Sequence, residues 1–418
     1  MAKSNYMTTI AIDTNRRAIH FYSMAGNDKS SIVHNIKNYT GAKLDESFFE
    51  EFKSAVKEFV ANTPSDSIRK VTVILPDSAV LTDTVKIPTV KGSAQAQKML
   101  DVTLGGIYKN IGELHIIAQM ADQNKQYTTI GISAVQNKIV SAIYSACSEN
   151  KLLVDTLTFA SASSIASATQ FNSKLKGESY VFLDIKNGYS RYVFVVDGKV
   201  MGYYSLPFGI ELLRYPQVVQ DDMLFDHSYA ELILLNAREK AKSQKITVMP
   251  FGDNSARPYA QGYPGTYIPA DTRQPESANE GIEVATDDVS SSEESLEDEQ
   301  AQQLYLKKSN RNIPKFMLRD IPETEEGVAY ENFRIFVKWA LNLIQNNQRI
   351  TELGKPEFVC VNLPEDLAGV IDMTNQESGE NGITFTRLSC PEQNSRVSAN
   401  LELYGGLFPG QINSTNKF

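Results

Sequence analysis

The chain has 418 residues, a length that suits two or three domains better than one. Its formal net charge of −9 argues against a general nucleic-acid binder, because such proteins present a basic surface. The three cysteines, Cys147, Cys360 and Cys390, are far apart and form no metal-binding spacing, so neither zinc nor a disulfide framework is expected.

The sequence contains no membrane-spanning segment. No apolar run reaches the roughly 18 residues that a span requires. The opening residues, MAKSNYMTTIAID, lack the apolar core of a signal peptide. We therefore expect a cytoplasmic protein, which could still reach the inner face of the cell membrane by docking on a membrane protein.

The first half of the chain alternates between strand and helix patterns. Three short apolar runs separated by polar turns predict a β-meander over residues 8–36. An amphipathic helix over 47–61 follows, with its apolar residues on one face. The next predicted elements are strands at 70–76 and 79–88, a helix at 93–108, strands at 114–121 and 127–135, a helix at 135–151, a strand at 152–160 and a helix at 161–170.

A second meander over 180–206 opens the other half. Asn187-Gly188 and Asp197-Gly198 each lie between alternating apolar residues and predict type I′ hairpin turns. The elements expected after it are a helix at 226–243, a long amphipathic helix at 330–350, a strand at 357–364, a helix-compatible segment at 365–375, a strand at 382–389 and a closing helix at 398–408.

Residues 250–315 differ in character from the rest. The segment begins rich in Gly and Pro, and its residues 276–300 carry many acidic side chains and no Lys or Arg. Such a composition cannot bury enough apolar surface to order itself, so it predicts a disordered insertion. A solvated loop, an interaction tail and a phosphorylation target all remain open for it.

The two meanders share one internal pattern. TTIAIDTNRRAIHFYSM (8–24) and YVFLDIKNGYSRYVFVV (180–196) can be aligned on Asp13 and Asp184. Each has an apolar strand, an aspartate near its end, a polar turn and an apolar return strand. This repetition predicts that the chain consists of two related halves.

Several segments together resemble the PilM family of type IV pilus assembly proteins, within the actin-like ATPase superfamily. IAIDTNRRAIHFYSM is similar to the family's first phosphate hairpin, and VFLDIKNGYSRYVFVVDGKVMGYYSLPFG to its second. KVTVILPDSAVLTDTVKIP resembles its strand-turn-strand signature, and MLFDHSYAELILLNAREKA its "acidic-x-AE-x-x-K" helix. The cell-division protein FtsA and the cytoplasmic part of GspL are similar in outline.

The resemblance implies an α/β fold of the actin-like kind, with two ribonuclease H-like lobes and a small inserted α+β subdomain. The expected organisation is 1–69 for the first part of lobe I, 70–155 for the inserted subdomain, 156–179 for the return to lobe I, 180–249 for the start of lobe II, 250–315 for the disordered insertion and 316–418 for the remainder of lobe II with the closing helix.

The resemblance also implies where a nucleotide would bind. In the superfamily, glycines after each aspartate let backbone N–H groups approach the phosphates, and the aspartates hold Mg²⁺ through water. Here Asn15 and Lys186 stand at the glycine positions, and Asn362-Leu363-Pro364 replaces the glycine-rich adenosine turn. The candidate residues of this degenerate site are Asp13, Thr14, Asn15, Asp184, Lys186, Asn187, Gly188 and Asn362, with Asp13 and Asp184 as the metal-facing pair if Mg-ATP binds.

We therefore expect a scaffold without ATPase activity and without a required cofactor, although binding of ATP with Mg²⁺ remains open. The family's partner is the cytoplasmic tail of a bitopic inner-membrane pilus protein, held in a groove between the first lobe and the inserted subdomain. A pilus motor ATPase and a second copy of the chain are further candidate partners.

Two other functions remain open. An active ATPase or small-molecule kinase would need phosphate turns that glycine makes accessible, and these positions carry other residues. A filament-forming membrane tether similar to FtsA would need a basic amphipathic helix at its end, whereas the sequence ends in the polar GQINSTNKF.

Overall fold

The computed structural model describes residues 6–14, 16–25, 33–41, 43–63, 70–108, 110–206, 208–215, 218, 324–346, 356, 358–378, 383–388, 400–412 and 417–418. All of them belong to one compact unit, formed by residues 1–264 and 322–418. The helix predicted at 226–243, the insertion predicted at 250–315 and Asn15 lie outside the described residues.

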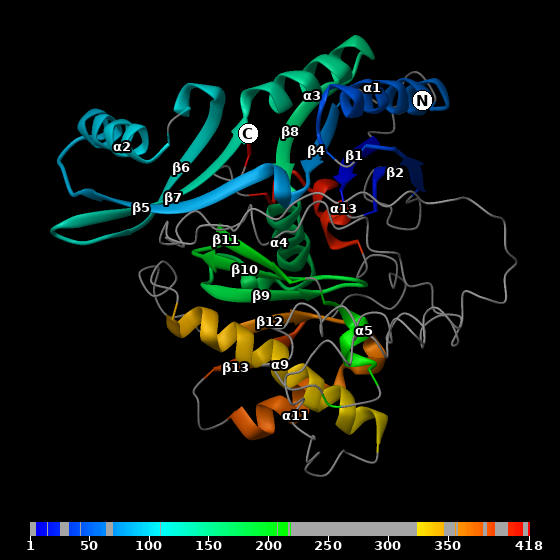
Figure 1. The fold of residues 1–418 in the computed structure, drawn as a ribbon, viewed down its shortest axis with the longest axis vertical. Coiled ribbons are helices and arrows are strands. Elements are labelled where there is room, and N and C mark those ends of the chain that lie inside the picture. Colours follow the sequence, from blue (N-terminus) through cyan, green and yellow to red (C-terminus); the bar gives the residue numbers. More distant parts are fainter. Residues whose placement is uncertain are drawn as a thin grey trace, which may run out of the picture. The chain divides into compact units, whose positions relative to one another are not determined.

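The first meander forms three strands of a five-stranded sheet. Its strands β1, β2 and β3 pair antiparallel, and two later strands, β4 and β8, add in parallel on the other side of β1, giving the order β3-β2-β1-β4-β8. The bounds are Tyr6–Asp13 for β1, Ala18–Ala25 for β2, Val33–Asn38 for β3, Lys70–Leu75 for β4 and Leu153–Phe159 for β8. Helices α1 (Glu46–Ala61) and α3 (Asn137–Glu149) lie together over this sheet (Figure 1).

The second meander repeats the same arrangement. Strands β9, β10 and β11 are antiparallel, and β12 and β13 add in parallel beside β9, giving the order β11-β10-β9-β12-β13. The bounds are Tyr180–Ile185, Ser190–Val196, Lys199–Leu206, Phe358–Asn362 and Thr384–Arg387. Two sheets with one topology confirm the predicted duplication and the two-lobed actin-like fold.

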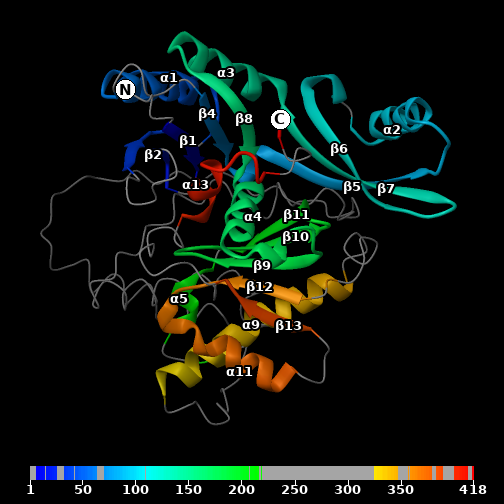
Figure 2. The ribbon, with the colours of Figure 1, turned by 180° about the vertical axis from the view of Figure 1, so that it is seen from behind.

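Helices cover both faces of the second sheet. The helices α5 (Ile210–Leu213), α9 (Glu325–Asn346) and α11 (Gly369–Ser378) lie on one side and α4 (Ala160–Phe171) on the other (Figures 1 and 2). Because side chains alternate along a strand, Tyr180 and Phe182 of β9 join the core around α4, whereas Val181 and Leu183 join the core around α9. The apolar core of the first lobe therefore continues onto the second sheet.

The last helix of the chain, α13 (Leu401–Gly406), packs against α4 and β1. A Cβ on Gly405 would overlap the carbonyl oxygen of Ser163, so the small residues of Tyr404-Gly405-Gly406 permit this close approach. The closing helix thus returns to the first lobe. Short 3₁₀ turns complete the described elements, at Asp77–Ala79, Ile111–Glu113, Ser173–Leu175 and Glu365–Leu367.

The inserted subdomain is smaller than predicted. It consists of a three-stranded antiparallel sheet in the order β5-β7-β6, which packs its own apolar core against α2. The bounds are Val80–Pro88, Tyr127–Gln136 and Leu114–Gln123 for these strands and Ser93–Ile107 for α2. The predicted bounds 70 and 155 are wrong, because β4 and the start of β8 pair within the first sheet. The insert begins after β4 and ends with β7.

The insert also contacts the second lobe. The Gln119 side chain donates to the Val200 carbonyl oxygen at 2.9 Å, and a Cβ on Gly131 would overlap the side chain of Met201. The Tyr203 hydroxyl donates to the backbone oxygens of Asp77 (2.6 Å) and Val80 (3.0 Å), where the chain enters the insert. Strand β11 of the second lobe therefore contacts the inserted subdomain and holds it in position.

Only one of the two predicted type I′ turns forms. Asp197 (φ 50°) and Gly198 (φ 72°) both have the positive φ that this turn requires. At Asn187-Gly188 only Gly188 does (φ 83°), and the turn closes through a bond from the Lys186 N–H to the Tyr189 oxygen at 3.0 Å. The prediction was wrong there because this loop has four residues, 186–189, between paired Ile185 and Ser190.

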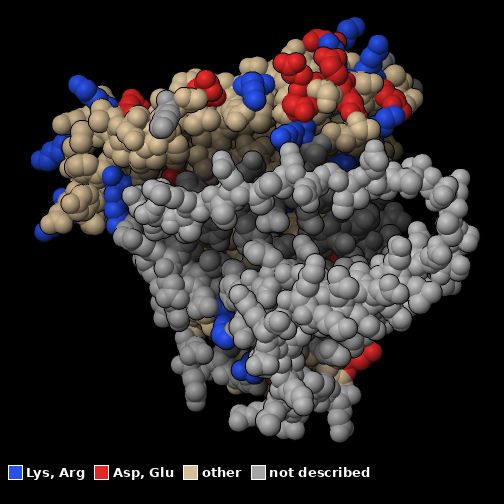
Figure 3. Space-filling view, viewed as in Figure 1, with Lys and Arg blue, Asp and Glu red and all other residues tan. Residues whose placement is uncertain are grey.

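Charged side chains are unevenly placed on the surface. Acidic residues gather over α1 and α3, whereas lysines mark the end of the insert that lies away from them (Figure 3). The exposed lysines of the insert are Lys86, Lys91, Lys98 and Lys125. Among the described residues, no helix is both long and apolar enough to cross a membrane.

Candidate functional site

The two aspartates singled out by the duplication occupy matching places in the two sheets. Asp13 is the last residue of β1 and pairs with Ala18 of β2, and Asp184 lies near the end of β9 and pairs with Arg191 of β10. Each thus stands where a strand leads into its hairpin turn. Their surroundings differ, because Asp184 is fully buried and Asp13 is not.

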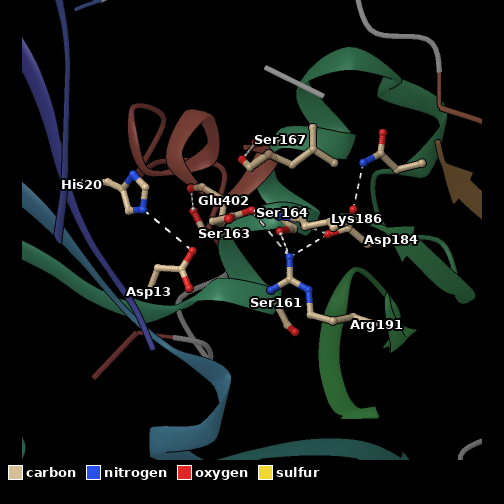
Figure 4. Close-up of polar contacts among 12 residues, drawn as sticks. Asp13, His20, Ser161, Ser163, Ser164, Ser167, Asp184, Lys186, Arg191 and Glu402 are labelled. Carbon is tan, nitrogen blue, oxygen red and sulfur yellow. Dashed lines mark hydrogen bonds and ion pairs between the residues drawn. The ribbon is translucent and has the colours of Figure 1, made fainter. Parts of the chain in front are cut away.

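A buried arginine is the centre of the site. The Arg191 side chain, 2% exposed, extends from β10 toward α4 (Figure 4). One terminal nitrogen donates to Asp184 Oδ2 at 2.6 Å and to Ser164 Oγ at 2.9 Å, and the other donates to Asp77 Oδ2 at 2.9 Å. Because Asp77 and Ser164 belong to the first lobe, this one guanidinium joins both lobes.

A buried lysine adds a second cation. Lys186, 3% exposed, forms an ion pair with Glu402 of α13, and its Nζ lies 3.6 Å from Asp184 Oδ2. Glu402 Oε2 also lies 3.6 Å from Arg191. We call these five residues, Asp77, Asp184, Lys186, Arg191 and Glu402, the cross-lobe charge cluster. It contains three carboxylates and two cations.

Both carboxylate oxygens of Asp184 are engaged. Oδ2 accepts from Arg191, and Oδ1 accepts from Asn362 Nδ2 at 2.8 Å. Asn362 is the last residue of β12, the strand beside β9, so the adjacent strand end supplies this donor. The carboxylate is held in one orientation, toward the first lobe.

Asp77 is the carboxylate that connects the cluster to helix α4 of the first lobe. Its Oδ1 accepts from the backbone N–H of Ser161 at 2.8 Å, in the first turn of α4, and its Oδ2 accepts from the Ser161 hydroxyl at 2.8 Å. A carboxylate at a helix N-terminus is stabilised by the free N–H groups and by the helix dipole. Oδ2, which accepts from the Ser161 hydroxyl, also accepts from Arg191, so residues of α4 and β10 bind the same carboxylate.

Two further serines of α4 hold α13 in place. The Ser163 hydroxyl donates to the backbone oxygen of Glu402 at 2.6 Å, and the Ser167 hydroxyl donates to that of Leu401. These bonds fix the helix that carries the Glu402 carboxylate. The other two serines of this helix, Ser161 and Ser164, bind charged groups of the cluster.

Charged neighbours within the cluster shift the pKa values of Glu402 and Lys186 toward their ionised forms. Burial would raise the pKa of Glu402, but the charges of Lys186 and Arg191 outweigh it and hold that pKa below its usual range. For Lys186 burial would lower the pKa, and the nearby Asp184 and Glu402 carboxylates raise it instead. Each ion is thus stabilised by its neighbours.

Asp13 lies in a separate set of contacts. It accepts from the backbone N–H of Arg16 at 3.0 Å, and its Oδ2 lies 3.8 Å from His20 Nε2. Burial would raise the pKa of Asp13, but the hydrogen bond from His20 and the charge of Arg16 lower it. Within the described residues, no hydrogen bond or ion pair links Asp13 to Asp184 directly.

The other predicted site residues lie on the turns. Thr14 contacts Ser78, with 3.4 Å between the two hydroxyl oxygens. Asn187 is exposed, and the Gly188 N–H donates to Glu211 at 2.8 Å. The structure therefore brings together Asp184, Lys186 and Asn362 and leaves Asp13, Thr14, Asn187 and Gly188 outside the charge cluster.

Sequence reasoning missed Arg191, Asp77 and Glu402. One signal was available for Arg191, because a charged residue stands second in a strand whose following residues, YVFVV, are all apolar. Asp77 and Glu402 sit in a turn and in a short helix, where acidic residues are ordinary. Nothing in the sequence indicates that they meet. Among the described residues, no group of three or more His, Cys, Asp or Glu could hold a metal ion.

Comparison with known proteins gives structural matches only. No protein-family model and no curated protein sequence match the chain. Among solved structures, it is similar to a PilM–PilN type IV pilus biogenesis complex, with 10% identity and a TM-score of 0.46 over 99% of this chain and 97% of that one. It is also similar to the cytoplasmic domain of EpsL, of the type II secretion system of Vibrio cholerae, with 12% identity and a TM-score of 0.34 over 49% of this chain and 71% of that one.

A third similar structure is MreB5 of Spiroplasma citri bound to ADP, with 10% identity and a TM-score of 0.37 over 98% of both chains. With identities of 10–12% and TM-scores below 0.5, these matches carry no argument about this chain. The fold assignment here rests on the strand order of the two sheets, and the function is argued from the residues of the charge cluster.

Replacing Arg191 tests the energetic role of the cluster. Arg191→Met leaves buried carboxylates without their partner, so we expect it to lower the free energy of unfolding by about 3–5 kcal/mol. The double variant Arg191→Met/Asp184→Asn should recover part of this loss, because it also removes the charge of one unpaired carboxylate. Urea denaturation measures both effects.

The matched control is Arg214→Met, which breaks an exposed ion pair with Asp366 and should cost less than about 1 kcal/mol. Equal losses at the two arginines would contradict the role assigned to Arg191.

The lowered pKa of Glu402 predicts a pH dependence. A carboxylate whose pKa is lower in the folded chain stabilises the fold fully above its unfolded pKa, about 4.3, and this stabilisation is lost as the pH falls through the folded pKa. We expect the thermal midpoint of Glu402→Gln to fall less steeply below about pH 4.3 than that of the wild type. Glu113→Gln is the control, because the Glu113 side chain is exposed to solvent, and its curve should run parallel to that of the wild type. Parallel curves for the wild type and Glu402→Gln would contradict the prediction.

Proposed function

We propose that this chain is an actin-like scaffold of a type IV pilus or related secretion assembly, which works by binding partners and does not hydrolyse ATP. The sequence resemblance to the PilM family indicates which kind of assembly the chain would belong to, and the duplicated actin-like fold is consistent with that resemblance. The observation that carries the proposal is the cross-lobe charge cluster, in which the chain's own Arg191 and Lys186 neutralise the acidic groups between the lobes.

A magnesium nucleotide fits these residues poorly. Asp184 would have to orient the water shell of the metal, yet both of its oxygens already accept hydrogen bonds from Arg191 and Asn362. Lys186 occupies the glycine position of the hairpin, and its side chain is buried against Glu402. Leu363 and Pro364 stand where the adenosine turn needs glycine, and Leu363 is buried in the core of the second lobe.

The charge balance also disfavours a free phosphate group. The cluster has one more carboxylate than it has cations. A polyphosphate would add negative charge to a low-dielectric region that already has an excess of it. Binding would require the ion pairs to break first, and no described contact compensates that loss.

The charge cluster would then replace a bound nucleotide as the contact that holds the two lobes together. The resemblance implies that the phosphates of a nucleotide would lie between the two hairpins, one from each lobe. Here Arg191 binds carboxylates of both lobes, and Lys186 binds α13, which packs on the first lobe. The chain would therefore keep one arrangement of its lobes without a ligand, which suits a scaffold whose partners need a constant surface.

The proposed partner is the cytoplasmic tail of a bitopic inner-membrane protein of the same assembly. The insert is the natural contact region, since it has its own core and β11 holds it in place. Its exposed lysines would favour a position close to anionic lipid headgroups, at the inner face of the membrane. A pilus motor ATPase and a second copy of the chain remain candidate additional partners.

Calorimetric titration with Mg-ATP tests the nucleotide part of the proposal. We expect no binding heat at millimolar nucleotide, because the acidic groups already have internal partners. The same titration on Arg191→Met shows whether the cations are what excludes the ligand. Micromolar affinity in the wild type would contradict the proposal and favour the alternative of an active ATPase.

Removal of the insert tests the partner. Leu81 and Ala134 are cross-strand neighbours, so residues 82–133 can be replaced by Asn-Gly, which closes a two-residue hairpin. We expect this variant to fold and to lose binding to a peptide that copies the cytoplasmic tail of a bitopic inner-membrane pilus assembly protein. Arg214→Met is the control that should bind like the wild type. Undiminished binding without the insert would contradict the assignment.

A further inference from the structure

We propose that the end of the insert far from α1 and α3 binds the surface of a bilayer that contains anionic lipids, without the help of a protein partner. We call this surface the lysine tip, and it consists of residues 86–98 and 123–129. The proposal rests on the proposed function, a scaffold of a membrane-associated assembly, and it names the surface by which the chain itself would contact the lipid.

The two segments of the lysine tip form one hydrogen-bonded end of the insert. Pro88 pairs with Tyr127 where β5 and β7 end, and the Thr89 N–H donates to the Gln126 oxygen at 2.9 Å. The Thr89 hydroxyl donates to the backbone oxygen of Asn124, also at 2.9 Å. The Asn124 side chain in turn accepts from the backbone N–H groups of Gln126 and Tyr127, at 2.9 and 2.8 Å. The turn between β6 and β7 is therefore held in one shape beside the end of β5.

The tip is positively charged in a chain whose net charge is −9. Its two segments contain no Asp or Glu, and they carry four exposed lysines, Lys86, Lys91, Lys98 and Lys125. Lysines mark this end of the insert, whereas acidic residues gather over α1 and α3 (Figure 3). Such a separation of charge would turn the tip toward an anionic surface and keep the acidic face away from it.

Acidic residues near the tip in the chain have other partners. Asp83 is buried and accepts from the Tyr108 hydroxyl at 2.6 Å, and Asp101 accepts from the Gln97 side chain at 2.7 Å. Among the described residues, three lysines of the tip form no ion pair: Lys91, Lys98 and Lys125. Their ammonium groups can therefore contact lipid phosphates without first breaking an internal pair.

The N-terminus of α2 adds to the positive potential of the tip. The N-cap residue of this helix is Gly92, which has no side chain to bind the free N–H groups of the first turn. That turn begins at Ser93 and contains no acidic residue. Free N–H groups and the helix dipole both attract anions, so this helix end supports the lysines around it.

The kinds of side chain at the tip favour a lipid surface over an acidic protein. Protein interfaces are enriched in arginine and depleted in lysine, and the tip has lysines and no arginine. A lysine acts as a point charge that needs no fixed geometry, which suits mobile headgroups. Tyr127 is 48% exposed at the tip, and an amphipathic tyrosine ring suits the boundary between headgroups and acyl chains.

Cosedimentation of the full chain with lipid vesicles tests the proposal. One set of vesicles is phosphatidylcholine alone, and the other has equal parts of phosphatidylcholine and phosphatidylglycerol. We expect the wild type to bind only the anionic vesicles, and less tightly as the salt concentration rises. Each lysine close to an anionic surface strengthens binding about fivefold, so Lys91→Gln/Lys98→Gln/Lys125→Gln should bind about 100-fold more weakly.

The matched control is Lys57→Gln/Lys138→Gln/Lys174→Gln, which removes the same charge from exposed lysines outside the insert. It should bind the anionic vesicles like the wild type, and both triple variants should keep the wild-type thermal midpoint. Equal losses in the two triple variants would overturn the proposal, because net charge alone would then set the binding.

Two further results would overturn the proposal. One is no binding of the wild type to anionic vesicles. The other is binding of the wild type to soluble polyglutamate but not to the vesicles, which would assign the lysines to an acidic protein. The proposed function is judged separately, with the peptide of the membrane-protein tail. If the tail binds and the vesicles do not, the lipid surface is wrong and the scaffold function stands. If the vesicles bind and the tail does not, the lipid surface stands and the proposed partner is wrong.

Discussion

The placement of one guanidinium between the lobes constrains the rest of the structure. Moving a charged group out of water costs several kcal/mol, and only close, well-oriented partners can offset that cost. Arg191 finds them in Asp184 of its own lobe and in Asp77 and Ser164 of the other. The second sheet, the first turn of α4 and the start of the insert must therefore keep fixed positions relative to this side chain.

This constraint gives a physical account of the proposal that this actin-like chain works without a nucleotide. The resemblance in sequence implies that a bound nucleotide and its metal would place their charges between the two aspartate hairpins, one from each lobe. In this chain, two cations and three carboxylates from the protein form the bridge, and serines of α4 hold the helix that supplies Glu402. With the lobes held by the chain itself, the surfaces formed by β8, β11 and the insert keep one arrangement, which is what the proposed scaffold function requires.

The sequence predicted the fold well and the site only in part. Apolar alternation and the aligned Asp13 and Asp184 were sufficient for the duplicated sheets, because both signals are local along a strand. The predicted bounds of the insert were wrong because the sequence of β4 predicts a strand but does not indicate which sheet that strand joins. The charge cluster could not be predicted, since Asp77 and Arg191 are 114 residues apart and meet only after both sheets have formed. The lysine at the glycine position was noticed, but its partner Glu402 lies in a short helix with no distinguishing pattern.

The claim that internal charges hold the lobes is tested most directly by a distance measured between them. Spin labels at Lys57→Cys on α1 and Asp372→Cys on α11 are exposed and lie in different lobes. Double electron–electron resonance should give one narrow distance distribution that is unchanged by Mg-ATP and that broadens in Arg191→Met. A broad distribution in the unliganded wild type that narrows or shifts on addition of Mg-ATP would contradict the account, because the nucleotide would then be what joins the lobes.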